Sequence, residues 1–149
     1  MKSSLLTKLT TSQAGFSALA LRIPVGITFI AHGAQKLFGA FGGYGLEGTG
    51  QFMASLGLEP GYTLAFLAGS AEFFGGIAIL FGLLTRPGAA VLAFTMLIAI
   101  FSVHIGNGLF MANNGYEYAL ALLAVSVSLV FSGAGRLSID SMISARGVK

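Results

Sequence analysis

The chain has 149 residues, of which 55% are hydrophobic and only 9% are charged, and its mean hydropathy is +0.86. A soluble domain carries about a quarter charged residues, so this composition excludes an ordinary soluble domain and indicates one compact domain that crosses a membrane several times. The absence of cysteine excludes disulfides, thiolate metal sites, iron–sulfur clusters, c-type haem and thiol exchange within the chain, and a formal net charge of +3 gives no support to a nucleic-acid partner.

Four segments approach the length of about 20 mainly apolar residues that a helix needs to cross the hydrocarbon core of a bilayer. They are residues 14–36, 62–84, 88–105 and 116–133. We therefore predict an all-α membrane protein, a four-helix transmembrane bundle that forms a single domain over the whole chain.

The first span, residues 14–36, contains Pro24 and three ionisable side chains, Arg22, His32 and Lys36. Pro24 predicts a kink unless neighbouring helices absorb it. A cleaved signal peptide is the alternative for this segment. It is disfavoured because Arg22 interrupts the apolar core and the apolar residues continue beyond a typical signal length.

The loop that follows, residues 37–61, is rich in glycine and contains a G-x-G-x-x-G match at residues 43–48. A dinucleotide-binding fingerprint needs a preceding strand and a following helix, and this match between two spans has neither. Further along, Phe52, Met53 and Leu56 share one helical face, which predicts a short amphipathic helix at the outer membrane interface. An irregular loop is the alternative.

Arg22 in the first span and Glu72 in the second are expected to form an ion pair within the bundle. With a helical rise of about 1.5 Å per residue they fall within about one turn of each other in depth. Consecutive spans are usually neighbours, and charges inside hydrocarbon are costly unless they are paired. The pair would either be structural or would leave Arg22 to bind an anionic or carbonyl-bearing group, with Glu72 orienting it.

A second group of polar side chains is expected at the outer rim of the bundle. His32 and His104 lie about 10 Å outward from the centres of their spans. Lys36 is one turn beyond His32, and Glu117 begins the fourth span beside Tyr116.

Three interpretations of this rim cluster remain open. It would bind a quinone head group, with His32 and Lys36 as donors to the carbonyl oxygens and Glu117 with His104 moving or holding protons. Alternatively, His32 and His104 would ligate a metal or a b-type haem. The third interpretation is that these are ordinary interfacial groups that bind loops and water.

The basic residues predict the orientation of the bundle. With four spans, both termini and the turn between the second and third spans share one side. The other side carries only Lys36. By the positive-inside rule both termini are expected in the cytoplasm. The basic residues of the first side are Lys2, Lys8, Arg86, Arg136, Arg146 and Lys149.

Short motifs run through nearly the whole chain in a specific order. They are HGAQKLFG at residues 32–39, GTG at 48–50, EFFGG at 72–76, GLLTR at 82–86, His104, GYEY at 115–118 and SID at 138–140. In these motifs the chain resembles the DoxX family of small bacterial inner-membrane proteins.

The resemblance implies a four-helix protein of the bacterial inner membrane. Some relatives are linked to quinone-coupled oxidoreductases, including thiosulfate:quinone oxidoreductase, and others to membrane oxidoreductase complexes and to oxidative or thiol stress. The candidate ligand-binding residues at matching or intramembrane positions are Arg22, His32, Lys36, Glu72, His104, Tyr116 and Glu117.

We therefore expect a small inner-membrane component of a redox system, such as a subunit of a quinone-linked oxidoreductase, that interacts with a quinone-like lipophile through the rim cluster. Haem b is the weaker alternative as a cofactor. Two other functions stay open. One is a non-catalytic anchor or scaffold for oxidoreductase partners, and the other is a carrier for a small solute that would work as a homo-oligomer.

Overall fold

The structure, a computed structural model, describes residues 5–146, and all of the regular elements in this range are helical. Two of the basic residues that predict the orientation, Lys2 and Lys149, lie outside the described residues, as does the side chain of Arg146. The α-helices are α1 (Leu5–Thr10), α2 (Ser17–Phe38), α3 (Gly45–Ser55), α4 (Gly61–Phe81), α5 (Thr85–Ala99), α6 (Glu117–Ser132) and α7 (Ile139–Arg146).

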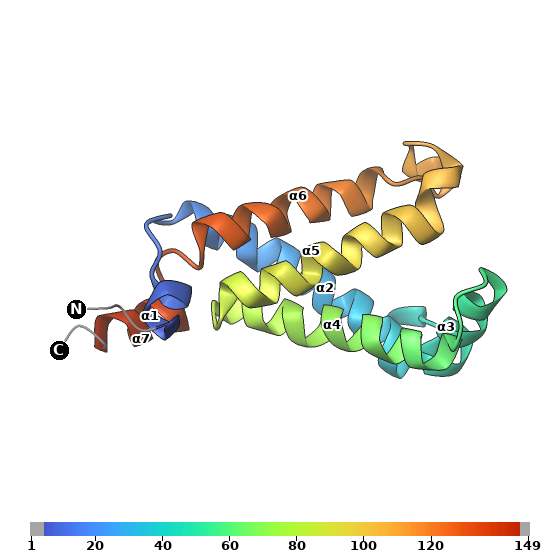
Figure 1. Cartoon of the computed structure of the whole chain (residues 1–149), viewed down its shortest axis with the longest axis horizontal. Coiled ribbons are helices and arrows are strands. Elements are labelled where there is room, and N and C mark those ends of the chain that lie inside the picture. Colours follow the sequence, from blue (N-terminus) through green and yellow to red (C-terminus); the bar gives the residue numbers. More distant parts are fainter. Residues whose placement is uncertain (1–4, 147–149) are drawn as a thin grey trace.

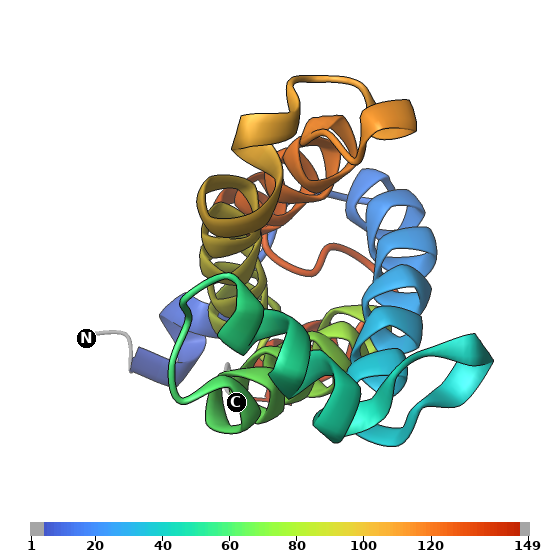
Figure 2. The same ribbon diagram turned by 90° about the vertical axis from the view of Figure 1, so that its right-hand side faces the viewer.

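Four long helices surround a common core, in the order α2, α4, α5, α6 (Figures 1 and 2). Helix α2 packs mainly on α4, α4 on α5, and α5 on α6, whereas α2 and α6 touch only slightly. The core between them is apolar and includes Phe29, Ile79, Leu92, Leu122 and Leu129. Helices α1 and α7 pack together at one end of the bundle, and α3 covers the other end (Figure 1).

Three helical stretches are long and apolar enough to cross a membrane: Ser17–Phe38, Gly61–Phe81 and Thr85–Asn107. The third consists of α5 continued by a π-helical turn, η2 (Ile100–His104), and a 3-10 turn, η3 (Ile105–Asn107). Helix α6 is also apolar but has only 16 residues. The prediction of an all-helical membrane protein is confirmed, and the fourth span stays a prediction.

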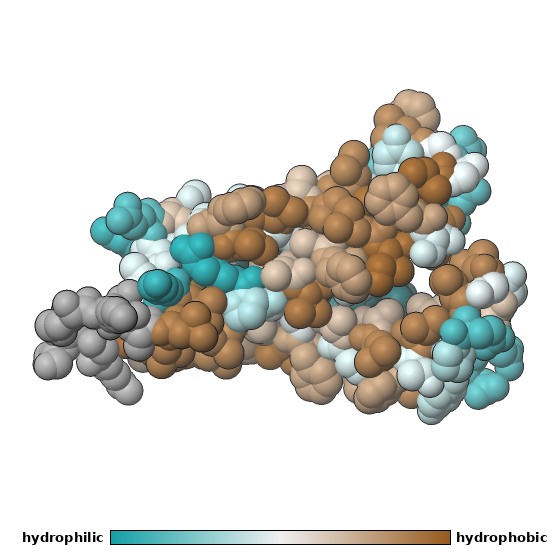
Figure 3. Space-filling model, in the orientation of Figure 1, coloured by the Kyte–Doolittle hydropathy of each residue, from teal (hydrophilic) through white to brown (hydrophobic). Residues whose placement is uncertain are grey.

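Many large apolar side chains of the long helices are exposed, and apolar residues make up much of the face shown in Figure 3. They include Phe66, Phe74, Phe81, Phe94 and Phe131, each more than half exposed. Burial of such side chains is favourable only if something apolar covers them, and a lipid bilayer does so along the whole length of the bundle.

Helices α2 and α4 lie antiparallel and approach each other through glycines. A Cβ atom added to Gly33 would lie 2.7 Å from the Cα atom of Phe73, and one added to Gly26 would lie 2.9 Å from the Cβ atom of Leu80. Only glycine allows two helix backbones to come this close. Helix α2 continues through Pro24 as a single helix from Ser17 to Phe38.

The stagger between these two helices follows from the same contacts. The first turns of α4 extend beyond the end of α2 and pack against α3, where Gly61 lies against Gly50. Conversely, the first turns of α2 extend beyond the last residue of α4. Residues at the same distance from the middle of their own helices are therefore not at the same depth in the bundle.

Candidate functional site

Lys36 and Glu72 form an ion pair between α2 and α4. The Nζ atom of Lys36 donates to Oε2 of Glu72 over 2.6 Å. The Glu72 side chain is only 5% exposed, and the Lys36 side chain is 25% exposed. Another molecule can therefore reach the Lys36 side chain, whereas the Glu72 carboxylate is almost completely covered.

The expected ion pair between Arg22 and Glu72 is wrong. Since Gly33 lies against Phe73, the segment of α2 that faces Glu72 is the one just before Lys36, and Arg22 is more than three turns away along α2. The expectation assumed that the centres of the two spans lie at one depth, which the stagger between α2 and α4 rules out. Arg22 instead lies beside Gly82, at the end of α4.

Arg22 is fully buried and binds the segment that leads into α7. Its Nη2 atom donates to the backbone oxygen of Leu137 over 3.0 Å, while Nε and Nη1 have no hydrogen-bond partner within residues 5–146. The nearby carboxylate of Asp140, also fully buried, accepts the backbone N–H groups of Leu84 and Thr85 over 2.7 and 2.9 Å. These contacts hold α7 and the segment before it against the turn between α4 and α5.

His32 lies one turn before Lys36 on the same face of α2. Its ring is half-buried and lies against the ring of Tyr118 of α6, with 5.9 Å between the ring centroids and a tilt of 53°. His32 has no hydrogen-bond partner among the described residues, so its ring nitrogens are available to another molecule. Together His32, Lys36, Glu72 and Tyr118 bring α2, α4 and α6 to one place, which we call the α2 outer site.

The other three rim residues bind the loop between α5 and α6. Nδ1 of His104 lies 2.9 Å from the backbone oxygen of Asn114. Because a carbonyl oxygen only accepts, Nδ1 carries the hydrogen and donates. The carboxylate of Glu117 accepts the backbone N–H of Met111 over 2.6 Å, and the backbone N–H of Tyr116 donates to the oxygen of Gly108 over 3.1 Å.

The rim cluster thus divides into two groups in the structure. His32 and Lys36 face the α2 outer site, whereas His104 and Glu117 hold a loop whose tip carries the exposed side chains Leu109, Phe110 and Met111. Within residues 5–146, three or more His, Asp and Glu side chains nowhere gather into a group that could hold a metal ion.

The sequence did not single out two residues that matter in the structure. They are Tyr118 of the α2 outer site and Asp140 at the end of the bundle that holds α1 and α7. In the sequence each of them appears only as part of a short motif, Tyr118 in GYEY and Asp140 in SID. Asp140 lies in a short polar stretch after the last apolar segment, and an Asp near a helix N-terminus is a common cap. Its partner helix is α5, more than fifty residues earlier, and nothing in the local sequence reveals that partner.

The α2 outer site is formed by α2 and α4, two helices long and apolar enough to cross a membrane, and by the shorter apolar helix α6. These features define a small α-helical membrane protein. The family model named DoxX matches residues 17–105, which contain the ion pair and His32. The chain belongs to the DoxX family.

Several relatives match most of this chain and most of their own length. The Bacillus subtilis (strain 168) protein named "Putative oxidoreductase CatD" is 35% identical over 84% of this chain and 85% of its own. "Inner membrane protein YqjF" of Escherichia coli (strain K12) is 36% identical over 86% and 92%, respectively. "Uncharacterized membrane protein Rv3486" of Mycobacterium tuberculosis is 31% identical over 87% and 83%. No solved structure matches the chain.

Proposed function

We propose that this protein is a small inner-membrane component of a redox system and that it interacts with a quinone-like lipophile at the α2 outer site. The observation that carries the proposal is the ion pair of Lys36 with Glu72 on two apolar helices. A charged pair in such a position is costly to keep and is usually retained for a site as well as for packing.

The donors of the site match the chemistry of a quinone head group. A quinone presents two carbonyl oxygens, which only accept hydrogen bonds. An ammonium group has three hydrogens, and Lys36 uses one of them on Glu72, so two remain for an acceptor. The neutral imidazole of His32 supplies one further N–H donor and is one turn away.

A proton source is part of the same arrangement. Reduction of a quinone to a quinol adds two electrons and two protons. The electrons would come from a partner protein or a reductant, since the chain has no cysteine and its residues carry no redox chemistry of their own. Lys36 can deliver one proton at a head-group oxygen, and the nearly buried carboxylate of Glu72 holds the Lys36 ammonium in place for this step. His32 can relay the second proton from water, because its ring accepts a proton at one nitrogen as it releases the hydrogen of the other.

His104, Tyr116 and Glu117 frame the site in this proposal by fixing the loop between α5 and α6. Arg22 takes a structural part at the opposite end. The name of the Bacillus relative gives independent support for a redox role. The proposal includes α6 as a fourth span and both termini in the cytoplasm, which the excess of basic residues at the terminal end supports.

A titration of the purified protein with a short-chain quinone tests the proposal. His32→Ala removes a half-buried ring that contacts Tyr118 and has no hydrogen-bond partner within residues 5–146, so the variant should fold. It should bind quinone about tenfold more weakly, as expected for loss of a hydrogen bond worth about 1.4 kcal/mol. Thr95→Val is the control, because the Thr95 hydroxyl bonds only within its own helix, to the oxygen of Val91.

Equal quinone affinity in the wild type and in His32→Ala would overturn the proposed site. If the purified wild type binds no quinone while redox activity follows proteins that co-purify with it, the scaffold function takes its place.

A further inference from the structure

A shallow groove of about 480 Å³ lies at the terminal end of the bundle, where the residues that precede α2 pass the end of α6. Its lining includes Lys8, Thr11, Ser12, Arg86 and Phe131. The groove is far from the α2 outer site, and no step of the proposed function uses it.

The positive charge of Arg86 beside this groove is not neutralised by a carboxylate. Its guanidinium donates to three backbone oxygens, those of Thr11, Val130 and Phe131, over 3.1, 2.8 and 2.7 Å. Nε has no hydrogen-bond partner in the described part of the chain. The carbonyl oxygens hold the guanidinium in a fixed position at the C-terminal end of α6, whose dipole offsets part of the charge, but no carboxylate of the described residues pairs with it.

Lys8 adds a second positive charge to the same groove. Its side chain is exposed and forms no ion pair with any described residue. The acidic residue at this end, Asp140, is fully buried and both of its carboxylate oxygens accept backbone N–H groups. The groove therefore presents two cationic groups with no accessible counter-charge from the described chain.

The surroundings of the groove are those of a membrane boundary. Phe131 is 76% exposed at the end of α6, and Leu5 and Leu6 of α1 are 73% and 50% exposed beside Lys8. Thr11 and Ser12 also line the groove, and their hydroxyl groups donate to the backbone oxygens of Thr7 and Ser132. A free phosphate would bind through the cationic groups alone. A lipid would also contact the apolar side chains beside them, so the surroundings favour a lipid.

We propose that this groove binds the phosphate head group of an anionic phospholipid. The phosphodiester lies between Lys8 and Arg86, a head-group hydroxyl faces Thr11, and the acyl chains run along Phe131 toward the bilayer. Each cationic side chain near a membrane surface contributes to attraction of anionic lipid.

Native mass spectrometry of the full chain in detergent tests this site, with phosphatidylglycerol and phosphatidylcholine of equal chain length as probes. We expect phosphatidylglycerol to bind more tightly than phosphatidylcholine. Lys8→Gln should weaken phosphatidylglycerol binding about fivefold, the effect of one surface cation. Because Lys8 is exposed, this variant should fold.

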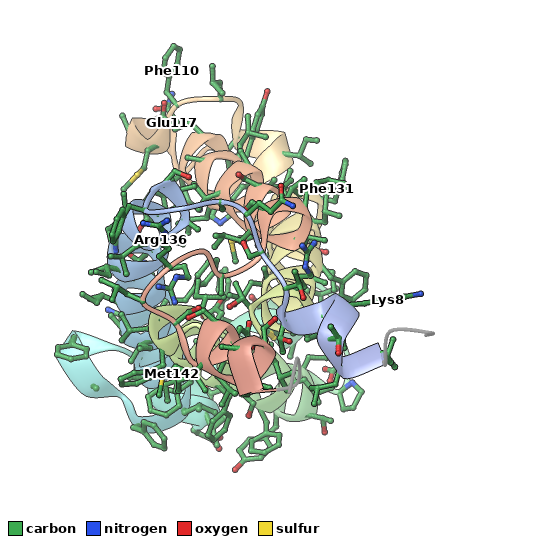
Figure 4. All side chains as sticks on the ribbon, turned by 90° about the vertical axis from the view of Figure 1, so that its left-hand side faces the viewer. Lys8, Phe110, Glu117, Phe131, Arg136 and Met142 are labelled. Atoms are coloured by element: carbon green, nitrogen blue, oxygen red, sulfur yellow. The ribbon has the colours of Figure 1, made fainter. Side chains whose placement is uncertain are left out.

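Arg136→Gln is the matched control. Arg136 is an exposed cation at the same end, but it lies on the opposite side of the bundle from Lys8 and Phe131, and its guanidinium lies 5.6 Å from the centre of the Phe16 ring (Figure 4). The control should leave phosphatidylglycerol affinity unchanged. Equal losses in both variants would show a general surface-charge effect and overturn the site, as would equal affinity for the two lipids. Displacement of the lipid by inorganic phosphate at millimolar concentration would assign the groove to free phosphate and overturn the lipid.

Discussion

Lys36 and Glu72 are unequally exposed, and this difference determines how much stability is lost when either side chain is removed. The carboxylate is 5% exposed and the ammonium-bearing side chain is 25% exposed. A lysine can extend its flexible chain to bring the ammonium to the membrane interface, whereas a short buried carboxylate cannot leave its place. Loss of the lysine is therefore the more damaging of the two changes.

Lys36→Ala should lower the free energy of unfolding by about 3 kcal/mol, because it leaves a buried carboxylate without its partner. Glu72→Ala should cost less, since Lys36 can reach the interface. The double variant Lys36→Gln/Glu72→Gln should be more stable than Lys36→Ala, because two amides can keep a hydrogen bond without burying a charge. Unfolding in mixed micelles with increasing SDS measures all three, and equal losses in the two single variants would contradict this account.

Asp140 is the second residue whose side chain is expected to contribute strongly to stability. It accepts two backbone N–H groups at the start of α5 and ties α7 to the turn before that helix. Hydrogen bonds to a charged group are worth about 1.5–3 kcal/mol each. Asp140→Ala should lower the melting temperature and expose α7 to protease.

Limited proteolysis with mass spectrometry of the fragments measures the release of α7. Met142→Ala on the exposed face of the same helix is the control, since Met142 is 59% exposed. An Asp140→Ala protein that is cleaved no faster than this control would show that α7 is held by other contacts.

At the scale of elements, the packing of α2 on α4 depends on small residues at the contact. Gly33 and Gly76 lie where the other helix's backbone is nearest, and a Cβ atom on Gly76 would lie 2.8 Å from the backbone nitrogen of Ile30. Such contacts set the stagger between α2 and α4. The stagger in turn places Lys36 opposite Glu72.

Gly33→Ala tests this directly. Alanine favours a helix over glycine by about 1 kcal/mol, but the added methyl group meets the Phe73 backbone, and overpacking costs about 1–3 kcal/mol. We expect a net loss of stability in SDS unfolding and weaker pairing of Lys36 with Glu72. Gly106→Ala is the control, because nothing lies within 4 Å of a Cβ atom there. An unchanged Gly33→Ala protein would show that α2 and α4 can move apart freely.

Element positions were largely predictable from the sequence, because long apolar runs ended by glycine have few alternatives to a membrane helix. Helices α2 and α4 begin and end within a few residues of the predicted spans, and so does α5 when its continuation to Asn107 is included. A helix also occupies part of the predicted amphipathic segment, as α3, although it begins earlier, at Gly45. The π-helical turn at the end of α5 was not predictable, since no residue type marks it.

The pairing of residues was much less predictable than the elements. Sequence position gives depth only if the centres of the helices coincide, and the close glycine contacts shift α2 relative to α4. For that reason the expected pair of Arg22 with Glu72 was wrong, while both residues were correctly recognised as buried charges. His32 and Lys36 share a face because they are four residues apart on one helix, which the sequence alone determines.

On the scale of the whole molecule, α1 and α7 lie at one end and α3 at the other (Figure 1). The account therefore predicts that Met142 faces the cytoplasm and that Asn113 faces the outer side of the membrane. Since the chain has no cysteine, Met142→Cys and Asn113→Cys each introduce a single label site. A membrane-impermeant maleimide should label Asn113→Cys in intact cells and Met142→Cys only after lysis. The reverse pattern would contradict the positive-inside assignment.

The most direct test of the central claim is mass spectrometry of the organic extract of the purified protein, with a visible absorption spectrum recorded first. The account predicts a co-purifying quinone and no Soret band in the wild type. It also predicts loss of the quinone from the folded Lys36→Gln/Glu72→Gln protein. A Soret band, an extract without quinone, or the same amount of quinone from both proteins would contradict a quinone site built on Lys36 and Glu72.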